Sequence, residues 1–303
     1  MCLVRAGWEN YTFEELEAKL NGAAGRGCQA ICRVYLEWPG NEASWRTNPG
    51  ANGSDVPAFL RPGLKFFNYS DRTGSEVGVT PDWSNAKLQV AILQLIAKLG
   101  EVYDGDTRVA YWQVGFLGKW GEWHDEPHSL FASTQLQREV LMAFNSSFTK
   151  TPTLARYPDT IGGLEAGSLR IGYHDDSFGQ DTLDDPKASW HFMSRMATAK
   201  ALDVWKTAPI GGEVRPELQK CLFARNITEA CADSGQTPED FGDCVAQTHS
   251  SWQCACSTAL RHSSVVASLL SVHTQSCVTV CACRVQLNQR GGQLARWQQG
   301  SRP

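Results

Sequence analysis

The sequence predicts an α/β fold, namely a TIM-like (β/α)8 barrel from which pieces are missing. Short β-rich runs alternate with amphipathic stretches, which is the pattern of βα units around a mainly parallel sheet. Six strand-like segments each lead into a polar turn that contains Gly or Pro. Because no Gly-rich dinucleotide fingerprint accompanies them, a barrel explains the pattern better than a nucleotide-binding fold.

The first half of the predicted barrel covers residues 1–108. A strand at residues 2–8 is followed by a helix, whose start is marked by the capping-box pattern Thr12-Phe13-Glu14-Glu15. The next strand covers residues 29–36. About 45 residues rich in Gly, Pro, Asn and Ser follow, and this length predicts a functional or disordered loop. A helix over residues 88–103 ends this half.

The second half covers residues 109–250 and repeats the alternation. A strand at residues 109–116 precedes a helix at 134–144. Short strands follow at 153–156, 169–173 and 208–210, and a helix at about 190–205 separates the last two. These two halves together form one predicted barrel domain, residues 1–250.

Residues 251–303 differ sharply in composition from the predicted barrel. They contain no Asp, Glu or Lys, but five Arg and five Cys, so this tail carries +5 and residues 1–250 carry −9. Two interpretations of the tail are open. It is an appended Cys-rich module, or it is translated non-coding or frame-shifted sequence that replaces the genuine end and disrupts the last barrel unit. Its Cys-x-Cys pairs lack the spacing of a zinc knuckle. We expect residues from about 257 onward to pack little against the barrel.

The overall composition excludes two function classes. A formal charge of −4 and a pI near 6.0 leave no basic surface for nucleic acid, and no apolar run is long enough to span a membrane. The chain shows no signal peptide, but eight of its eleven cysteines lie between Cys221 and Cys283. Five sequons, at Asn10, Asn52, Asn68, Asn145 and Asn226, also suit a secreted, disulfide-bonded glycoprotein.

Catalytic groups of a βα barrel lie where the strands end, on the turns that lead to the next helix. The polar residues at these places mix carboxylates, aromatic rings, Arg and His, with no Ser or Cys beside an evident base. They are Arg33, Tyr35, Glu37, Gln113, Trp120, Glu122, His124, Arg156, Tyr157, Asp159, Tyr173, His174, Asp175, Asp176, Glu213 and Arg215. Two carboxylates flanked by Trp and Tyr are typical of glycosidic chemistry, in which one acid protonates the leaving oxygen.

These residues also have structural interpretations. Glu122 fits a buried structural carboxylate and Glu213 fits a helix cap, while Arg33 and Arg156 are equally typical of structural ion pairs. His124 and His128 have the spacing of a metal-binding pair on a helix, but Pro127 indicates a turn there. The pair Asp175-Asp176 offers oxygen ligands for Ca²⁺, although acidic turn residues are usually just solvated. We expect neither a metal nor a cofactor.

The order of five motifs resembles a known protein family. The segments CRVYLEW, QVGFLGKWGEWH, ARYPD, RIGYHDDSF and GGEV are similar to an uncharacterised barrel family, catalogued as the domain of unknown function 4874 followed by the domain of unknown function 4832. The likeness covers about residues 1–250, and the WGEWH run is its most specific part. Members resemble exported glycoside hydrolases of the (β/α)8 type. The resemblance implies that residues 2–8 form the second barrel strand, so that the first strand is missing.

By the same count, the strand at 109–116 is the fourth and the strand at 208–210 is the seventh. In retaining glycosidases of the largest barrel clan, the acid/base follows strand four and the nucleophile follows strand seven. The resemblance therefore implies these roles for Glu122 and Glu213. The sequence departs from the clan in one respect, because Gly121 stands where an Asn usually precedes the acid/base.

Two functions fit these observations. The first is glycoside hydrolysis of a polysaccharide or oligosaccharide, with a raised pKa of Glu122 between two Trp rings and an ionised Glu213. The second is a non-catalytic barrel whose Trp residues, including Trp38, stack on sugars. In both cases the predicted substrate-binding residues are Arg33, Tyr35, Glu37, Trp120, Trp123, His124, Arg156, Tyr173, His174 and Asp175.

Overall fold

The fold is described from a computed structural model of the chain. It describes residues 11–39, 54, 56–70, 77–124, 130–158, 162–215, 218, 238–250, 252–254 and 281–286. The predicted strand at residues 2–8 lies outside the described residues, as do Asp159 and His128.

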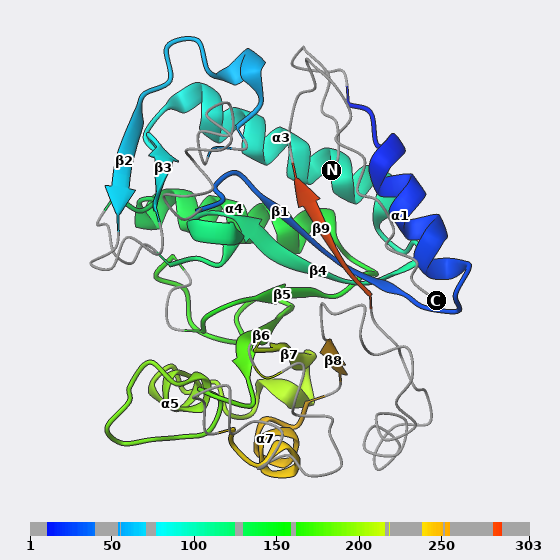
Figure 1. Cartoon of the computed structure of the whole chain (residues 1–303), viewed down its shortest axis with the longest axis vertical. Coiled ribbons are helices and arrows are strands. Elements are labelled where there is room, and N and C mark those ends of the chain that lie inside the picture. The colour runs from blue at the N-terminus through cyan, green and yellow to red at the C-terminus, as the bar shows by residue number, and fades with distance from the viewer. Residues whose placement is uncertain are drawn as a thin grey trace, which may run out of the picture.

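A seven-stranded parallel sheet, in the order β8-β7-β6-β5-β4-β1-β9, forms the centre of the molecule (Figure 1). The strands are β1 (Ala30–Tyr35), β4 (Val109–Phe116), β5 (Thr153–Ala155), β6 (Ile171–Phe178), β7 (Ile210–Val214), β8 (Trp252–Cys254) and β9 (Cys281–Gln286). From β4 to β8 each strand lies beside the next one in the sequence, which is the winding of a βα barrel. The predicted fold class is confirmed, with β8 and β9 as the two edges of an open sheet among the described strands.

Helices cover the sheet, with α1 (Glu14–Ala24) and α3 (Ala86–Tyr103) beside β1 and β4, and α5 (Phe192–Thr198) and α7 (Phe241–Thr248) near β6 to β8 (Figure 1). Helix α4 (Thr134–Ser147) packs against α3. The apolar side of α3 is buried against Trp112 and Val114 of β4. Helix α1 begins after Phe13, one residue later than the predicted capping residue Thr12.

The predicted helix at 190–205 is shorter than expected. It divides into α5 and a 3-10 turn, η3 (Val204–Lys206). Lys200 between them has a φ of 56°, which a right-handed helix does not contain.

The predicted long loop after β1 contains regular structure, so that prediction is wrong in part. A short 3-10 helix, η1 (Ala58–Leu60), leads to an antiparallel hairpin of β2 (Phe66–Ser70) and β3 (Val77–Pro81). Tyr69 lies opposite Gly78, where an added Cβ would clash with the Tyr69 ring. A glycine is therefore needed at this position of the hairpin.

Two strands come from beyond residue 250. β8 pairs with β7, and β9 pairs residue for residue with β1. The expectation that residues beyond about 257 pack little is therefore wrong for β9, because main-chain pairing does not depend on the unusual composition of this segment. Part of the Cys-rich region lies outside the described residues; within the described part, Cys244 is a buried thiol and not a disulfide partner. No described helix is long and apolar enough to cross a membrane.

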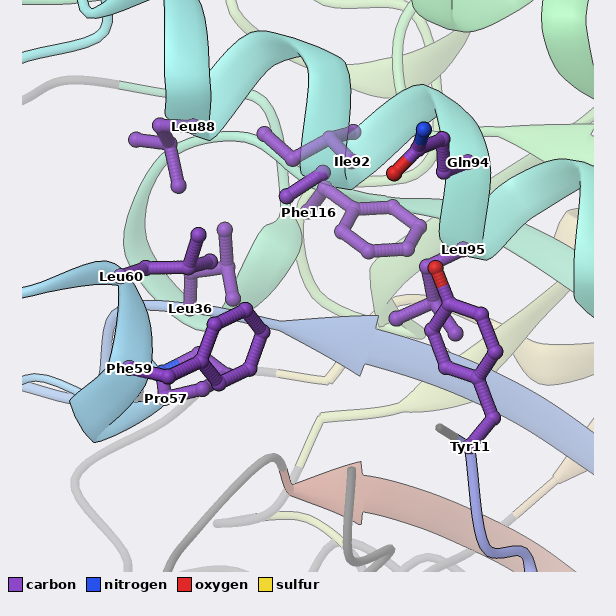
Figure 2. Close-up of a pocket in the computed structure, with 11 residues that line it drawn as sticks. Tyr11, Leu36, Pro57, Phe59, Leu60, Leu88, Ile92, Gln94, Leu95 and Phe116 are labelled. Atoms are coloured by element: carbon purple, nitrogen blue, oxygen red, sulfur yellow. The ribbon is translucent and has the colours of Figure 1, made fainter. Parts of the chain in front are cut away.

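An apolar pocket lies between α3 and the ends of β1 and β4 (Figure 2). It encloses about 380 Å³ of space that opens to solvent. Leu36, Leu60, Leu88, Leu95 and Phe116 are among its lining residues, none of which is charged. This pocket is therefore separate from the polar residues that the sequence singled out.

Candidate functional site

Arg33 is the centre of a buried polar cluster at the carboxyl ends of the strands. Its Nε donates to Gln113 Oε1 at 2.6 Å, its Nη1 to Glu122 Oε1 at 2.9 Å and its Nη2 to Asp176 Oδ2 at 2.5 Å. Burial lowers the pKa of Arg33, but the carboxylates of Asp176, Glu122 and Glu213 outweigh burial and raise it. This guanidinium therefore stays charged, although its residue is only 4% exposed.

Arg156, at the end of β5, completes the cluster from the other side. Its Nη1 donates to Asp175 Oδ1 at 3.0 Å and its Nε lies 3.5 Å from Asp176 Oδ2. Asp175 also accepts hydrogen bonds from the Ser177 amide at 2.9 Å and the Thr182 hydroxyl at 2.8 Å. Burial raises the pKa of Asp175 despite these donors.

Asp176 links both guanidinium groups to His174. Its Oδ1 lies 2.7 Å from His174 Nδ1. Burial raises the pKa of Asp176, but Arg33, His174 and Arg156 outweigh it and hold this pKa well below its ordinary value. The pKa of His174 is lowered, because burial outweighs the attraction of Asp176. An ionised Asp176 beside a neutral imidazole is the arrangement that these shifts favour.

Glu122 is positioned by a strained loop after β4, which we call the β4 loop and define as residues 117–124. Phe116, Trp120 and Trp123 have φ values of 68°, 52° and 60°, a region that bulky side chains rarely occupy. The loop is held by Trp123, whose amide donates to Leu117 O and whose indole Nε1 donates to Gly115 O, both at 3.0 Å. The surrounding contacts therefore fix Glu122 against Arg33.

The pKa of Glu122 shifts in the direction opposite to the one expected for a proton donor. Burial and the nearby Asp176 raise this pKa, but the contact with His124 and the charges of Arg33 and Arg156 outweigh them, and the pKa is lowered. The sequence prediction considered only the flanking Trp rings, and it missed the cations that come from β1 and β5. This lowered pKa favours the ionised form of the Glu122 carboxylate.

Partly exposed aromatic rings contact one another near Glu122. The rings of Trp38 and Trp120 meet edge to face, with centroids 6.4 Å apart. His124 lies 5.8 Å from the Trp120 ring, and its Nε2 is 3.7 Å from Glu122 Oε2. Tyr35 contacts Trp38 from the buried side, at 5.2 Å between centroids. His124 thus connects Glu122 to a chain of ring contacts that runs through Trp120 to Trp38.

Glu213 approaches the same arginine from β7. Its side chain is buried, and its charge contributes to the raised pKa of Arg33. The neighbouring Gly212 allows β7 to pack tightly, because a Cβ there would lie 2.4 Å from Asp175 O. Glu122 and Glu213, which were predicted to act as a pair, therefore both lie near Arg33.

Three predicted binding residues point away from this cluster. Trp123 is buried and its indole supports the β4 loop, so it offers no surface to a sugar. Tyr173 is buried beside Leu141 and Leu169 on the helix-covered side of β6, and its pKa is raised to about 12 by burial. Glu37 is fully buried, and its carbonyl accepts the Trp120 amide at 3.0 Å. Tyr173 is separated from the site by its packing among Leu141, Leu164 and Leu169.

Three residues that the cluster needs were not among the predicted catalytic or substrate-binding residues. Gln113 orients Arg33, Asp176 bridges the two arginines, and Thr182 holds Asp175. The alternation of His174 and Asp176 along one strand face was the available signal. No signal pointed to Thr182, which lies in a loop. No described group of three or more His, Cys, Asp or Glu side chains has the arrangement of a metal site.

We call the whole group the carboxyl-end cluster, which consists of Arg33, Gln113, Glu122, Arg156, His174, Asp175, Asp176 and Glu213. It presents one partly exposed carboxylate beside aromatic faces and holds its other charges in buried pairs. Such a surface can stack on a flat ring and accept hydrogen bonds from hydroxyl or amino groups.

Comparison with known proteins finds similar solved structures only. No family model matches the chain, and no curated protein matches it. The chain is similar to endoglycoceramidase II from Rhodococcus sp. in its lactosyl-enzyme intermediate, with a TM-score of 0.46 and 13% identity, over 84% of this chain and 63% of that chain. It is also similar to a GH5-4 broad-specificity endoglucanase from an uncultured bacterium, with a TM-score of 0.43 and 9% identity, over 83% of this chain and 69% of that chain. The chain thus spans less than two thirds of the endoglycoceramidase.

Proposed function

We propose that this protein is a barrel of the glycoside hydrolase type that binds a saccharide at the carboxyl-end cluster. The observation that carries the proposal is the chain of partly exposed rings, Trp38, Trp120 and His124, which reaches Glu122 through His124. Aromatic faces stack on sugar rings, and a carboxylate accepts hydrogen bonds from sugar hydroxyls. Arg33 and Arg156 act by holding the carboxylates in place.

Binding without hydrolysis is the form of this function that the electrostatics favour. A glycosidase acid must hold a proton near neutral pH, and Glu122 has a lowered pKa. Hydrolysis is the second candidate. Glu122 follows β4, Glu213 lies on β7, and the charges of both carboxylates raise the pKa of Arg33. In that case substrate binding would have to weaken the Glu122–Arg33 pair so that Glu122 gains its proton.

Membership of the uncharacterised barrel family described above, and export from the cell, belong to the same proposal. The WGEWH run supports the first, and the five sequons support the second. Of the sequons in described segments, Asn68 is exposed on β2, whereas Asn145 accepts a hydrogen bond from the Arg170 amide at 3.0 Å. Asn68 is therefore the more accessible acceptor.

Saccharide binding can be tested by titrating the protein with neutral oligosaccharides and following tryptophan fluorescence. We expect Trp120→Ala to weaken binding by up to about tenfold, because stacked aromatic contacts contribute about 0.5–1.5 kcal/mol. Trp190→Ala is the matched control, since Trp190 is 62% exposed and lies on the turn before α5. Equal affinities for these two variants, or no binding by the unaltered protein, would overturn the proposed function.

Hydrolysis is tested separately with a panel of aryl glycosides. If the second candidate is correct, Glu122→Gln and Glu213→Gln each lower kcat by orders of magnitude while KM changes little. Binding without turnover would leave the first candidate standing. Turnover that persists in both variants would show that this pair is not catalytic.

A further inference from the structure

We propose that the saccharide bound here is an amino sugar, whose ammonium group pairs with Oε2 of Glu122. This inference rests on the proposed function, because it specifies the ligand of the same site. It follows from the charge of the ion network, from the place of Glu122 within it and from the ring that lies beside that carboxylate.

The ion network contains more negative than positive charge. The carboxylates of Glu122, Asp175 and Asp176 contact only two guanidinium groups, those of Arg33 and Arg156. His174 faces Asp176, but its lowered pKa favours the neutral ring, so it adds no full positive charge at neutral pH. The field of Glu213 also acts on Arg33. A cationic ligand would offset this excess, whereas an anionic one would increase it.

Glu122 is the member of this network that a ligand meets first. Its side chain is 15% exposed, whereas those of Arg33, Arg156, Asp175 and Asp176 are more deeply buried. Arg33 holds its Oε1 at 2.9 Å, while Oε2 lies 3.7 Å from His124 Nε2, which is beyond hydrogen-bond distance. Oε2 is therefore the oxygen that is placed to receive a ligand donor.

The surroundings of Oε2 suit an ammonium group carried on a sugar ring. His124 and Trp120 contact each other beside Glu122, and both are half-exposed. An indole ring can stack on a sugar ring, and the Trp120 ring already has a cation nearby, because Lys119 Nζ lies 5.9 Å from its centroid. An amino sugar combines a stacking ring and an ammonium group in one molecule, because its amine is attached directly to the ring that stacks. A uronic acid presents a carboxylate at this place and would be repelled.

The inference is tested on the unaltered protein with three oligosaccharides of matched length. These are oligomers of glucosamine, their N-acetylated counterparts and oligomers of galacturonic acid, titrated at low salt and at a pH where the amine is protonated. We expect the glucosamine oligomer to bind about fivefold more tightly than the neutral one, which is the upper range for a partly exposed ion pair. Added salt should reduce the difference, and the uronic acid oligomer should bind most weakly.

Variants locate the cation. Glu122→Gln should bring the ratio of the two affinities close to one, and Glu122→Asp, which keeps the charge, should retain a preference for the amine. Glu101→Gln, on the exposed side of α3, is the matched control and should leave the ratio unchanged. A ratio that persists in Glu122→Gln would overturn the assignment of Oε2.

Different results would overturn the preference for an amino sugar and the binding of saccharides in general. Equal or tighter binding of the neutral oligomer would overturn the amino-sugar inference and leave saccharide binding intact. No binding of any of the three oligomers would overturn the proposed function as well. The comparison of three ligands on the unaltered protein decides this even if Glu122→Gln does not fold.

Discussion

Arg33 divides its donors among three parts of the chain that are far apart in sequence. Gln113 comes from β4, Glu122 from the β4 loop and Asp176 from β6, and all three accept from the one guanidinium. A planar group with several donors suits this arrangement, whereas a lysine offers a single charged nitrogen. The position of the Glu122 carboxylate therefore depends on Arg33, which a ligand need not touch.

Replacing Arg33 should be far more costly than replacing an exposed arginine in a comparable ion network. Arg33→Met leaves Asp176 and Glu122 buried without their main cation, and we expect it to lower the free energy of unfolding by about 3 kcal/mol or more. Arg108→Met is the control, because Arg108 pairs with Glu17 and Asp106 but is partly exposed, and it should cost about 1 kcal/mol or less. Urea unfolding of both variants measures the difference, and equal losses would contradict the role of Arg33.

At the scale of elements, the β4 loop shows how backbone conformation supports the site. Gly118 and Gly121 have φ values of 74° and 68°, and they alternate with aromatic residues that also adopt positive φ. Lys119 between them is buried, with its Nζ 5.4 Å from the Tyr69 ring centroid of the β2–β3 hairpin. The hairpin that the sequence did not predict thus helps to hold the loop that carries Glu122.

Gly118→Ala should destabilise the β4 loop by more than the cost of placing alanine at a positive φ. A Cβ at Gly118 would lie 2.6 Å from His124 O, in addition to the cost of its φ. Gly27 has a similar φ of 72° but open space around it, so Gly27→Ala isolates the backbone cost of about 1–2 kcal/mol. We expect Gly118→Ala to lower the free energy of unfolding by at least about 1 kcal/mol more than this control and to weaken saccharide binding. Thermal unfolding with ligand titration checks both effects.

The turn before β5 provides a pH-dependent contact between α3 and the sheet. Asp104 follows α3 and accepts hydrogen bonds from the Lys150 and Thr151 amides and the Thr149 hydroxyl. Burial raises the pKa of Asp104, but these donors outweigh it and lower this pKa from 3.8 to about 2. A carboxyl group whose pKa is lowered by folding stabilises the protein above its unfolded pKa, and this contribution is lost as the pH falls from 3.8 towards 2.

Asp104→Asn should therefore lower the free energy of unfolding by about 1 kcal/mol at neutral pH. The difference from the unaltered protein should shrink as the pH falls through the same window, because protonated Asp104 no longer offers a charged acceptor. Urea unfolding at several pH values measures the two curves. Parallel curves over the whole acid range would contradict this assignment.

The elements with long, regular patterns were predicted well, and the site was predicted only in outline. The strand at 109–116 and the helix at 88–103 bury one continuous face each, so their periodicity is strong, and β4 and α3 match them closely. β6 was ended too early at Tyr173, because Asp175 and Asp176 are typical of a turn. They are strand residues here because Arg33 and Arg156 neutralise them. The lowered pKa of Glu122 depends on the same long-range contacts, which no local pattern reveals.

At the scale of the whole molecule, the sheet joins segments from both ends of the described chain. β1 lies between β4 and β9, and the register with β9 runs from Ala30 beside Cys281 to Tyr35 beside Gln286. β1 also carries Arg33, the centre of the carboxyl-end cluster. Because a central strand is held on both edges, the pairing with β9 fixes the strand from which the site is built.

Shortening the chain after residue 257 should therefore lower its stability, in contrast to the expectation from composition. The change removes β9 and exposes the main-chain groups of β1 along one edge. We expect the Tm to fall by more than about 5 °C, which corresponds to roughly 1–2 kcal/mol for a domain of this size. A chain shortened after residue 287 keeps β9 and serves as the control, with a Tm close to that of the full chain. Saccharide binding should weaken in the first variant and persist in the second, because only the first leaves β1 and Arg33 at an open edge. Equal Tm values for the shorter variant and the full chain would show that β9 does not support the sheet.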